Sequence, residues 1–350
     1  MATVSRAQPA WASLFRPGLA LDWAFVAASA WILVGLHLDG WAHAHRPGLE
    51  SFFTPWHGIL YSGFFALAGV TLLTWVANGR EMPAGYGLTG AGVLVFLAAG
   101  AGDMVWHTLF GIEANVEALL SPTHLGLATG MALMVAGPLR SAQRATLPAL
   151  LAAGLLLSVF TFFTQFTQPG GRPWPFAGNE PTAATFPVAD ATPDFPVFAA
   201  GVPAHEVANI LGLAGILLAT ILFLSFALFL LHRFALPFGA LTLVFAVDGA
   251  LLALMRDTPW WLAVALVAGL AADALARLLR PREGGWRLRA FAAAAPAALW
   301  SAYFAALALA GDVWWSVHLW TGAIVASALA GVALSYLMHT PRATPAPLAP

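Results

Sequence analysis

Residues 210–231, ILGLAGILLATILFLSFALFLL, contain no charged side chain and decide the class of fold. About 20 apolar residues in a helix are enough to cross the hydrocarbon core of a bilayer. Similar runs recur along the chain and predict about ten transmembrane helices, at residues 20–42, 56–78, 87–110, 123–140, 147–167, 204–231, 236–255, 260–279, 290–310 and 314–338. The expected fold is an all-α integral membrane protein, a polytopic helical bundle.

The composition supports this class and excludes several kinds of chemistry. The chain has 350 residues, of which 60% are hydrophobic and 9% are charged, whereas soluble proteins have about 25% charged residues. It has no cysteine, which excludes disulfides, thiolate metal sites and cysteine nucleophiles. All fifteen basic residues are arginine, so a lysine Schiff base and a P-loop lysine are also excluded. The net charge of -1 gives no reason to expect a nucleic-acid partner.

The arginines divide the ends of the predicted helices into two groups. Twelve fall at one side: Arg6, Arg16, Arg80, Arg140, Arg144, Arg233, Arg277, Arg280, Arg282, Arg287, Arg289 and Arg342. Only Arg46, Arg172 and Arg256 fall at the other side. Cytoplasmic loops carry the excess of arginine. We therefore expect a protein of the plasma (inner) membrane with both termini in the cytoplasm.

The predicted organisation has four parts. Residues 1–19 form a cytoplasmic N-terminal segment, and residues 20–140 form a four-helix repeat. Residues 141–339 form the remaining transmembrane bundle, and residues 340–350 form a disordered tail rich in Pro and Ala. A long outer loop at 168–203 contains eight prolines. It is expected to be either a polyproline-like connector or a lid over an outward-facing site.

A polar stretch interrupts the apolar pattern where the first predicted helix ends. Asp39 and His43 are four residues apart, so they share one helix face. His57 follows in the sequence FTPWH, in which Thr54 suits an N-cap and Pro55 suits the first helical position. In the first turn of a helix, the dipole favours the neutral imidazole that binds metals. The hairpin thus offers one carboxylate and two imidazoles near the outer membrane face.

The same order of residues recurs in the third and fourth predicted helices. Asp103 and His107 are again four apart, and His124 follows in SPTH, 67 residues after His57. A weaker third copy, VPAH, contains His205 but lacks the preceding acid. Two copies favour metal binding over a single Asp–His hydrogen bond. No catalytic residue is assigned, and the predicted metal ligands are Asp39, His43, His57, Asp103, His107, His124 and His205.

The first motif resembles the copper-binding C subunit of the particulate methane and ammonia monooxygenases. That subunit carries an Asp, a His four residues later and a second His after an FTP stretch, as do Asp39, His43 and His57. Its second cluster has Asn where this chain has Asp103, followed by two histidines at similar spacing. The resemblance covers residues 37–124. It implies copper near the outer membrane face and oxidation by O2.

The resulting hypothesis is a membrane-embedded metal protein that acts as an O2-dependent, monooxygenase-like oxidase of a small apolar or lipid substrate. Nitrogen and oxygen ligands suit copper, with zinc or iron as alternatives. Three other hypotheses stay open: a metal transporter or metal-handling protein, a zinc-dependent lipid hydrolase using Ser121, and a structural site in a partner subunit. The expected partners are the lipid bilayer, the substrate and further subunits.

The loop lengths bear on the number of metal sites. Thirteen residues separate His43 from His57, and sixteen separate His107 from His124. Unequal loops place the two histidine pairs in different geometry. We therefore predict two neighbouring, inequivalent mononuclear sites rather than one dinuclear centre.

Other polar residues carry separate expectations. His37 is predicted to be interfacial or to support the metal ligands, and His45 to be solvated. Asp248 and Asp273 lie within predicted spans, where an acid pairs with arginine or lines a proton or ion path. Arg277, four residues after Asp273, is the candidate partner.

Overall fold

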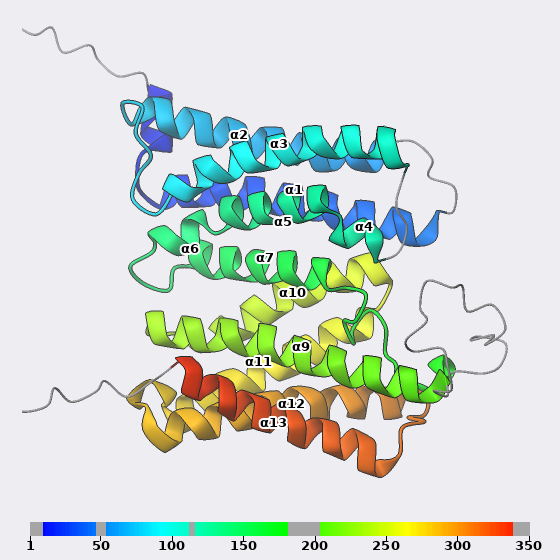
Figure 1. Ribbon diagram of the computed structural model, residues 1–350. Helices are drawn as coiled ribbons and strands as arrows, with labels where there is room; N and C mark the ends of the chain where they lie inside the picture. The colour runs from blue at the N-terminus through cyan, green and yellow to red at the C-terminus, as the bar shows by residue number, and fades with distance from the viewer. Residues whose placement is uncertain (1–9, 47–53, 112–115, 181–203, 339–350) are drawn as a thin grey trace, which may run out of the picture.

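Long helices run side by side along one common direction and alternate in polarity along the chain (Figure 1). The computed structural model describes residues 10–46, 54–111, 116–180 and 204–338, without the side chains of Ala10, Glu117, Ala118 and Ala204. These ranges contain no β-strand, and only an isolated bridge joins Phe176 to Val313. The N-terminal segment before residue 10, most of the Pro-rich loop and the tail lie outside the described residues.

The elements follow one another as η1 (Ala10–Phe15), α1 (Leu19–His45), α2 (Pro55–Ala77), α3 (Gly87–Phe110), α4 (Glu117–Leu120), α5 (Pro122–Val135), α6 (Gly137–Ser141), α7 (Leu147–Phe163), η2 (Ala177–Asn179), α9 (Ala204–Arg233), α10 (Ala240–Arg256), α11 (Pro259–Leu279), η4 (Pro281–Glu283), α12 (Gly285–Ala310) and α13 (Val317–Met338).

Seven of the described helices are long and apolar enough to cross a membrane, namely α1, α2, α3, α9, α11, α12 and α13. Each of the ten predicted spans contains a helix, but α5, α7 and α10 have only 14, 17 and 17 residues. A helix of 14 residues is about 21 Å long, and a hydrocarbon core is about 30 Å thick. The structure therefore supports a membrane-spanning helical bundle with seven candidate spans and does not confirm the predicted ten.

The short helices have local causes in the sequence. α5 ends at Val135 because Gly137 and Pro138 start the separate helix α6, and a proline cannot donate the backbone hydrogen bond that would continue α5. α10 begins only at Ala240, because Gly239 before it has a φ of 91°. That conformation suits glycine and breaks the helical path.

Two helix pairs, α1 with α2 and α3 with α5, carry the two Asp–His–His motifs, and both pairs cross at glycines. A Cβ placed on Gly63 of α2 would lie 2.6 Å from the Cα of Ile32 in α1. A Cβ placed on Gly130 of α5 would lie 2.6 Å from the backbone nitrogen of Phe96 in α3. Helices in a bilayer associate through such small residues because these let the backbones approach closely. Each pair is thereby held at a fixed separation.

α1 also connects the two halves of the bundle. It packs against α7 and α10, which lie near the middle of the view in Figure 1. A Cβ on Gly40 of α1 would lie 2.8 Å from the ring of Phe162 and 2.9 Å from the sulfur of Met255. α1 ends, and α2 begins, at what we call the histidine end of the bundle, the end that carries His43, His57, His107 and His124.

Candidate metal centre

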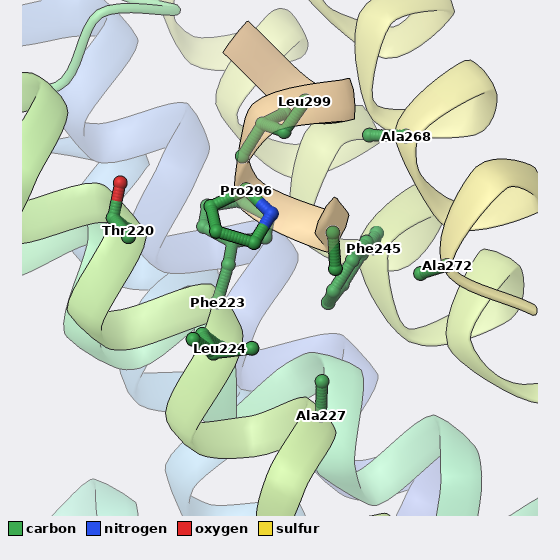
Figure 2. Close-up of a pocket in the computed structure, with 10 residues that line it drawn as sticks. Thr220, Phe223, Leu224, Ala227, Phe245, Ala268, Ala272, Pro296 and Leu299 are labelled. Carbon is green, nitrogen blue, oxygen red and sulfur yellow. The ribbon is translucent and has the colours of Figure 1, made fainter. Parts of the chain in front are cut away.

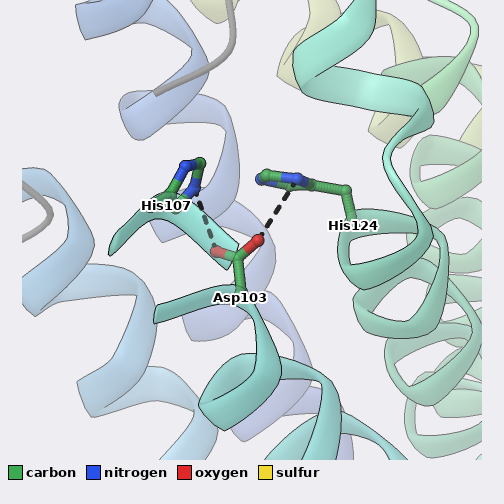
Figure 3. A group of neighbouring side chains, drawn as sticks. All are labelled: Asp103, His107 and His124. Atoms are coloured by element: carbon green, nitrogen blue, oxygen red, sulfur yellow. Dashed lines mark ion pairs between the residues drawn. The ribbon is translucent and has the colours of Figure 1, made fainter. Parts of the chain in front are cut away.

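Asp103, His107 and His124 form the tighter of two clusters at the histidine end, and we call them the second triad (Figure 3). Oδ2 of Asp103 lies 3.4 Å from Nε2 of His107, and its Oδ1 lies 3.4 Å from Nδ1 of His124. One donor atom from each residue lies within 4.8 Å of the others. Asp103 is only 2% exposed. This geometry matches the prediction that an i,i+4 pair and a histidine from the next helix meet.

Neighbouring groups orient each member of the second triad. The Thr123 hydroxyl donates a 2.8 Å hydrogen bond to Oδ1 of Asp103. Nδ1 of His124 lies 2.7 Å from the Ser121 hydroxyl. Nδ1 of His107 lies 3.2 Å from the carbonyl oxygen of Gly111. Such outer contacts fix the ring orientation of metal-binding histidines.

Asp39, His43 and His57 form the first triad, which is more open. Oδ2 of Asp39 lies 3.4 Å from Nε2 of His57 and 3.6 Å from Nδ1 of His43. The two imidazole centroids are 5.8 Å apart. Oδ1 of Asp39 is buried and has no hydrogen-bond partner among the described residues. A cation bound here would give this buried oxygen the partner it lacks.

The helix starts of α2 and α5 follow the predicted capping pattern. Thr54 accepts a 3.1 Å hydrogen bond from the backbone N–H of His57, and Ser121 accepts one of 3.4 Å from His124. Pro55 and Pro122 occupy the predicted first helical position. The N-caps thus set both histidines in the first turn, on the side of the acids.

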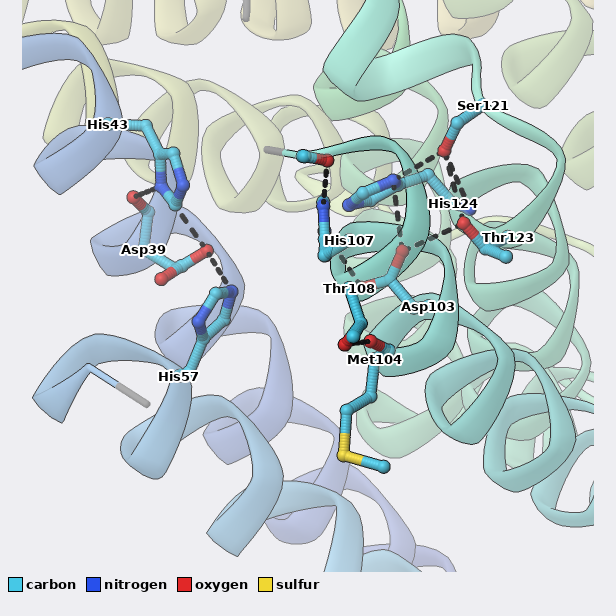
Figure 4. A network of polar contacts seen from close by, with 11 residues as sticks. Asp39, His43, His57, Asp103, Met104, His107, Thr108, Ser121, Thr123 and His124 are labelled. Atoms are coloured by element: carbon cyan, nitrogen blue, oxygen red, sulfur yellow. Dashed lines mark hydrogen bonds and ion pairs between the residues drawn. The ribbon is translucent and has the colours of Figure 1, made fainter. Parts of the chain in front are cut away.

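The two triads are neighbours. Figure 4 shows both at the histidine end, and Asp39 is within electrostatic range of His124. Tyr61 of α2 is within electrostatic range of both Asp39 and Asp103, and its ring centroid lies 6.3 Å from that of His57. The sequence analysis did not single out Tyr61. Its position one turn after His57 was the signal that could have found it.

A groove with a volume of about 440 Å³ reaches the first triad between α2 and α3. Its lining residues are Thr54, His57, Gly58, Tyr61, Phe65, Gly100 and Met104. Phe65 is 65% exposed and Met104 is 44% exposed, so the mouth faces the apolar surroundings of the bundle. A second cavity, between α9, α10, α11 and α12 (Figure 2), measures only about 20 Å³. The groove at His57 is therefore the better candidate for a substrate site.

The structure does not bring the seventh predicted ligand into either triad. His205, at the start of α9, is exposed, and its ion-pair partner among the described residues is Glu206, at 3.8 Å. His45 is not simply solvated, because its Nε2 lies 2.9 Å from Oδ2 of Asp257. His37 is fully buried rather than interfacial, and its Nε2 lies 3.1 Å from the hydroxyl of Ser158.

The two intramembrane acids of the second half have different surroundings. Asp273 accepts hydrogen bonds from the backbone N–H groups of Leu241 and Thr242, at 3.2 and 2.9 Å, and thus caps α10. It does not pair with Arg277, whose guanidinium lies over the ring of Phe238. Asp248 accepts a 2.5 Å hydrogen bond from Thr161. Asp273 therefore caps a helix instead of pairing with arginine, and Asp248 is bound by a hydroxyl.

Comparisons with protein-family models, with curated proteins and with solved structures give no match for the chain. The function has to be inferred from the residues and geometry of the site itself.

Proposed function

We propose that this chain is a membrane metalloprotein whose two Asp–His–His triads each hold a metal ion, with copper as the metal and oxidation of a small apolar or lipid substrate by O2 as the reaction. The observation that carries the proposal is the occurrence of two separately supported triads at one end of the bundle. All six donors are nitrogen or oxygen, a set that suits Cu(II) and leaves open positions on a three-ligand metal.

The protein groups have distinct parts in this proposal. The carboxylates of Asp39 and Asp103 supply negative charge beneath a cation, and the four histidines supply neutral nitrogen donors. Bound copper would supply the chemistry that binds and activates O2. Insertion of one oxygen atom of O2 into a C–H bond requires two electrons and two protons, and these come from an external reductant and from water.

The groove at His57 gives the proposal a substrate path. Its walls are mostly apolar, and its mouth lies among exposed apolar side chains of two candidate spans. A substrate dissolved in the bilayer reaches His57 there without passing through water. Binding pockets for small molecules have this character, with apolar walls and few polar groups at one end.

The decisive experiment is metal analysis of the purified chain by mass spectrometry, combined with EPR for Cu(II). We expect copper near two atoms per chain, and O2-dependent oxidation of a short hydrocarbon when a reductant is added. Bound copper without any oxidation would support metal handling instead. No bound metal after mild purification and reconstitution would overturn the proposal.

One observation favours a second candidate function, zinc-dependent hydrolysis of a lipid. The hydroxyl of Ser121 lies 2.7 Å from Nδ1 of His124, within reach of the second triad. A zinc ion there would activate water for attack on an ester or amide. Ser121 also caps α5, which explains its position without catalysis. Zinc in the metal analysis, with release of fatty acid from a lipid ester, would select this function.

A further inference from the structure

Two of the three arginines that the sequence places at the histidine end, Arg172 and Arg256, lie close together. Arg172 follows the end of α7, and Arg256 is the last residue of α10. A Cβ placed on Gly171 would lie 3.1 Å from Nε of Arg256, so the Arg256 side chain runs along the backbone next to Arg172. Burial, and then the charge of Arg172, lower the pKa of Arg256. The two cations are therefore close enough to repel each other.

No acid neutralises this pair within the described part of the chain. Neither guanidinium forms an ion pair or a side-chain hydrogen bond with a described residue. Arg172 instead lies over the ring of Trp174, with its Cζ 4.1 Å from the ring centroid. The nearest acid in sequence, Asp257, is used by His45, which lies 2.9 Å from its carboxylate. The pair thus presents two adjacent, uncompensated guanidinium groups.

A helix N-terminus lies next to the arginines. α11 begins at Pro259, and its N-cap Thr258 makes no side-chain capping hydrogen bond. The Thr258 hydroxyl oxygen is buried and has no hydrogen-bond partner in the described structure. The first N–H groups of a helix carry partial positive charge and bind anions readily. In α11, Pro259 has no N–H and that of Trp261 donates to the Thr258 carbonyl oxygen, which leaves the N–H of Trp260. Three kinds of donor are therefore concentrated within residues 171–172 and 256–260.

We propose that Arg172, Arg256 and the N-terminus of α11 form a binding site for a phosphate group. A guanidinium binds two oxygens of a phosphate through its planar fork of N–H groups. A tetrahedral oxyanion can accept hydrogen bonds from two guanidinium groups and a hydroxyl at once, because its oxygens point in different directions. The site lies at the end of the bundle, at the level where a spanning helix meets the headgroups. The phosphate is either free in solution or part of a phospholipid headgroup.

The test uses the full-length chain, purified in detergent and stripped of lipid. One arm measures the rise in thermal unfolding temperature with inorganic phosphate, using chloride at equal ionic strength as the reference. The other arm measures retention of phosphatidylglycerol by native mass spectrometry. We expect Arg172→Gln and Arg256→Gln each to weaken binding about tenfold or more, because each removes charge-assisted hydrogen bonds. A response to phosphate identifies a soluble ligand, and a response to the lipid alone identifies a headgroup.

Two further variants keep the test decisive. Arg46→Gln removes the remaining arginine at this end, which belongs neither to the pair nor to α11, and should bind like the wild type. Arg256→Lys keeps the charge but loses the planar fork, and should bind several-fold more weakly while folding normally; circular dichroism and gel filtration check the fold. The proposal is overturned if the wild type binds neither ligand. It is also overturned if Arg172→Gln and Arg256→Gln bind as the wild type does, or if Arg46→Gln loses as much affinity as they do.

Discussion

Thr123 donates a 2.8 Å hydrogen bond to Oδ1 of Asp103 and holds this carboxylate between its two histidines. The first triad has no counterpart to this bond. The residue 67 positions before Thr123 is Trp56, which has no hydroxyl, and Oδ1 of Asp39 is buried without a partner among the described residues. The two triads therefore differ in how firmly their acids are held, and the predictions below use this difference.

The first prediction concerns the second carboxylate. Asp103→Asn should weaken metal binding at the second triad by about 10- to 100-fold, the range seen when a group that orients metal ligands is changed. Asn keeps the oxygen that accepts from Thr123 but loses the charge beneath the metal. Isothermal titration with copper measures the loss. Asp312→Asn, an exposed acid away from both triads, is the matched control and should leave affinity unchanged. Equal affinities of the two variants would exclude Asp103 from the metal site.

The second prediction is that the triads bind metal independently. His57→Ala should empty the first triad and leave the second occupied, and His124→Ala should do the converse. The measurement is metal stoichiometry with EPR on each purified variant. The more open first triad should also lose its metal at a lower chelator concentration. Loss of all metal in either variant, or spin-coupled copper in the wild type, would replace two sites with one shared centre.

A third prediction tests the glycine contact beneath the second triad. Gly130→Leu should push α5 away from α3, because its Cβ would already lie 2.6 Å from a backbone atom. Overpacking costs about 1–3 kcal/mol, and the separation should also abolish metal binding at the second triad. Thermal unfolding and metal content are the readouts. Gly69→Leu on α2 is the control, since a Cβ there meets nothing within 4 Å. If the two variants behave alike, the glycine contact does not position the triad.

The fourth prediction concerns the cap of α10. Asp273→Ala should lower the free energy of unfolding by about 2–4 kcal/mol, because it leaves the N–H groups of Leu241 and Thr242 without their acceptor. Asp273→Asn keeps one acceptor oxygen and should cost less. Unfolding in mixed detergent micelles measures both. Arg277→Ala should have little effect, since Arg277 does not pair with Asp273. A large effect of Arg277→Ala with a small effect of Asp273→Ala would restore the ion pair expected from the sequence.

The fifth prediction is topological. The chain has no cysteine, so single cysteines can be introduced without background. Ser316→Cys lies exposed at the histidine end, and Glu81→Cys lies exposed at the opposite end. An impermeant maleimide added to intact cells should label position 316, and should label position 81 only after lysis. The reverse pattern would place the triads on the cytoplasmic side.

Local features of the site could be predicted from the sequence because they depend on neighbours within one turn of helix. The Asp–His pairs and the caps at Thr54 and Ser121 are of this kind. The broken span at 123–140 also had a visible cause, since Gly137 and Pro138 stand within it. The glycine crossings left a signal as well: Gly63 and Gly130 each follow the second histidine of their motif by six residues.

Contacts between distant segments could not be predicted in the same way. His45 contacts Asp257, and Arg256 lies against Gly171 beside Arg172, across separations set by the packing of α1, α7 and α10. Asp273 illustrates why pairing rules fail. The i,i+4 spacing suggested Arg277, but the N-terminus of α10 offers two N–H donors and a hydroxyl to the same carboxylate. Helix spacing predicts which groups are within reach, and tertiary packing decides which of them is used.

The cap at Asp273 also constrains how the protein is made. A carboxylate entering the bilayer alone costs about 2.5–3.5 kcal/mol at mid-depth, whereas one bound to the N-terminus of a neighbouring helix has its charge shared by that helix. Asp273 on α11 receives this help only from α10, which is synthesised just before it. The free energy of membrane insertion is therefore more favourable when α10 and α11 enter the bilayer together as one hairpin. If an assembly step separated them, the Asp273 carboxylate would face lipid without the N–H donors of α10.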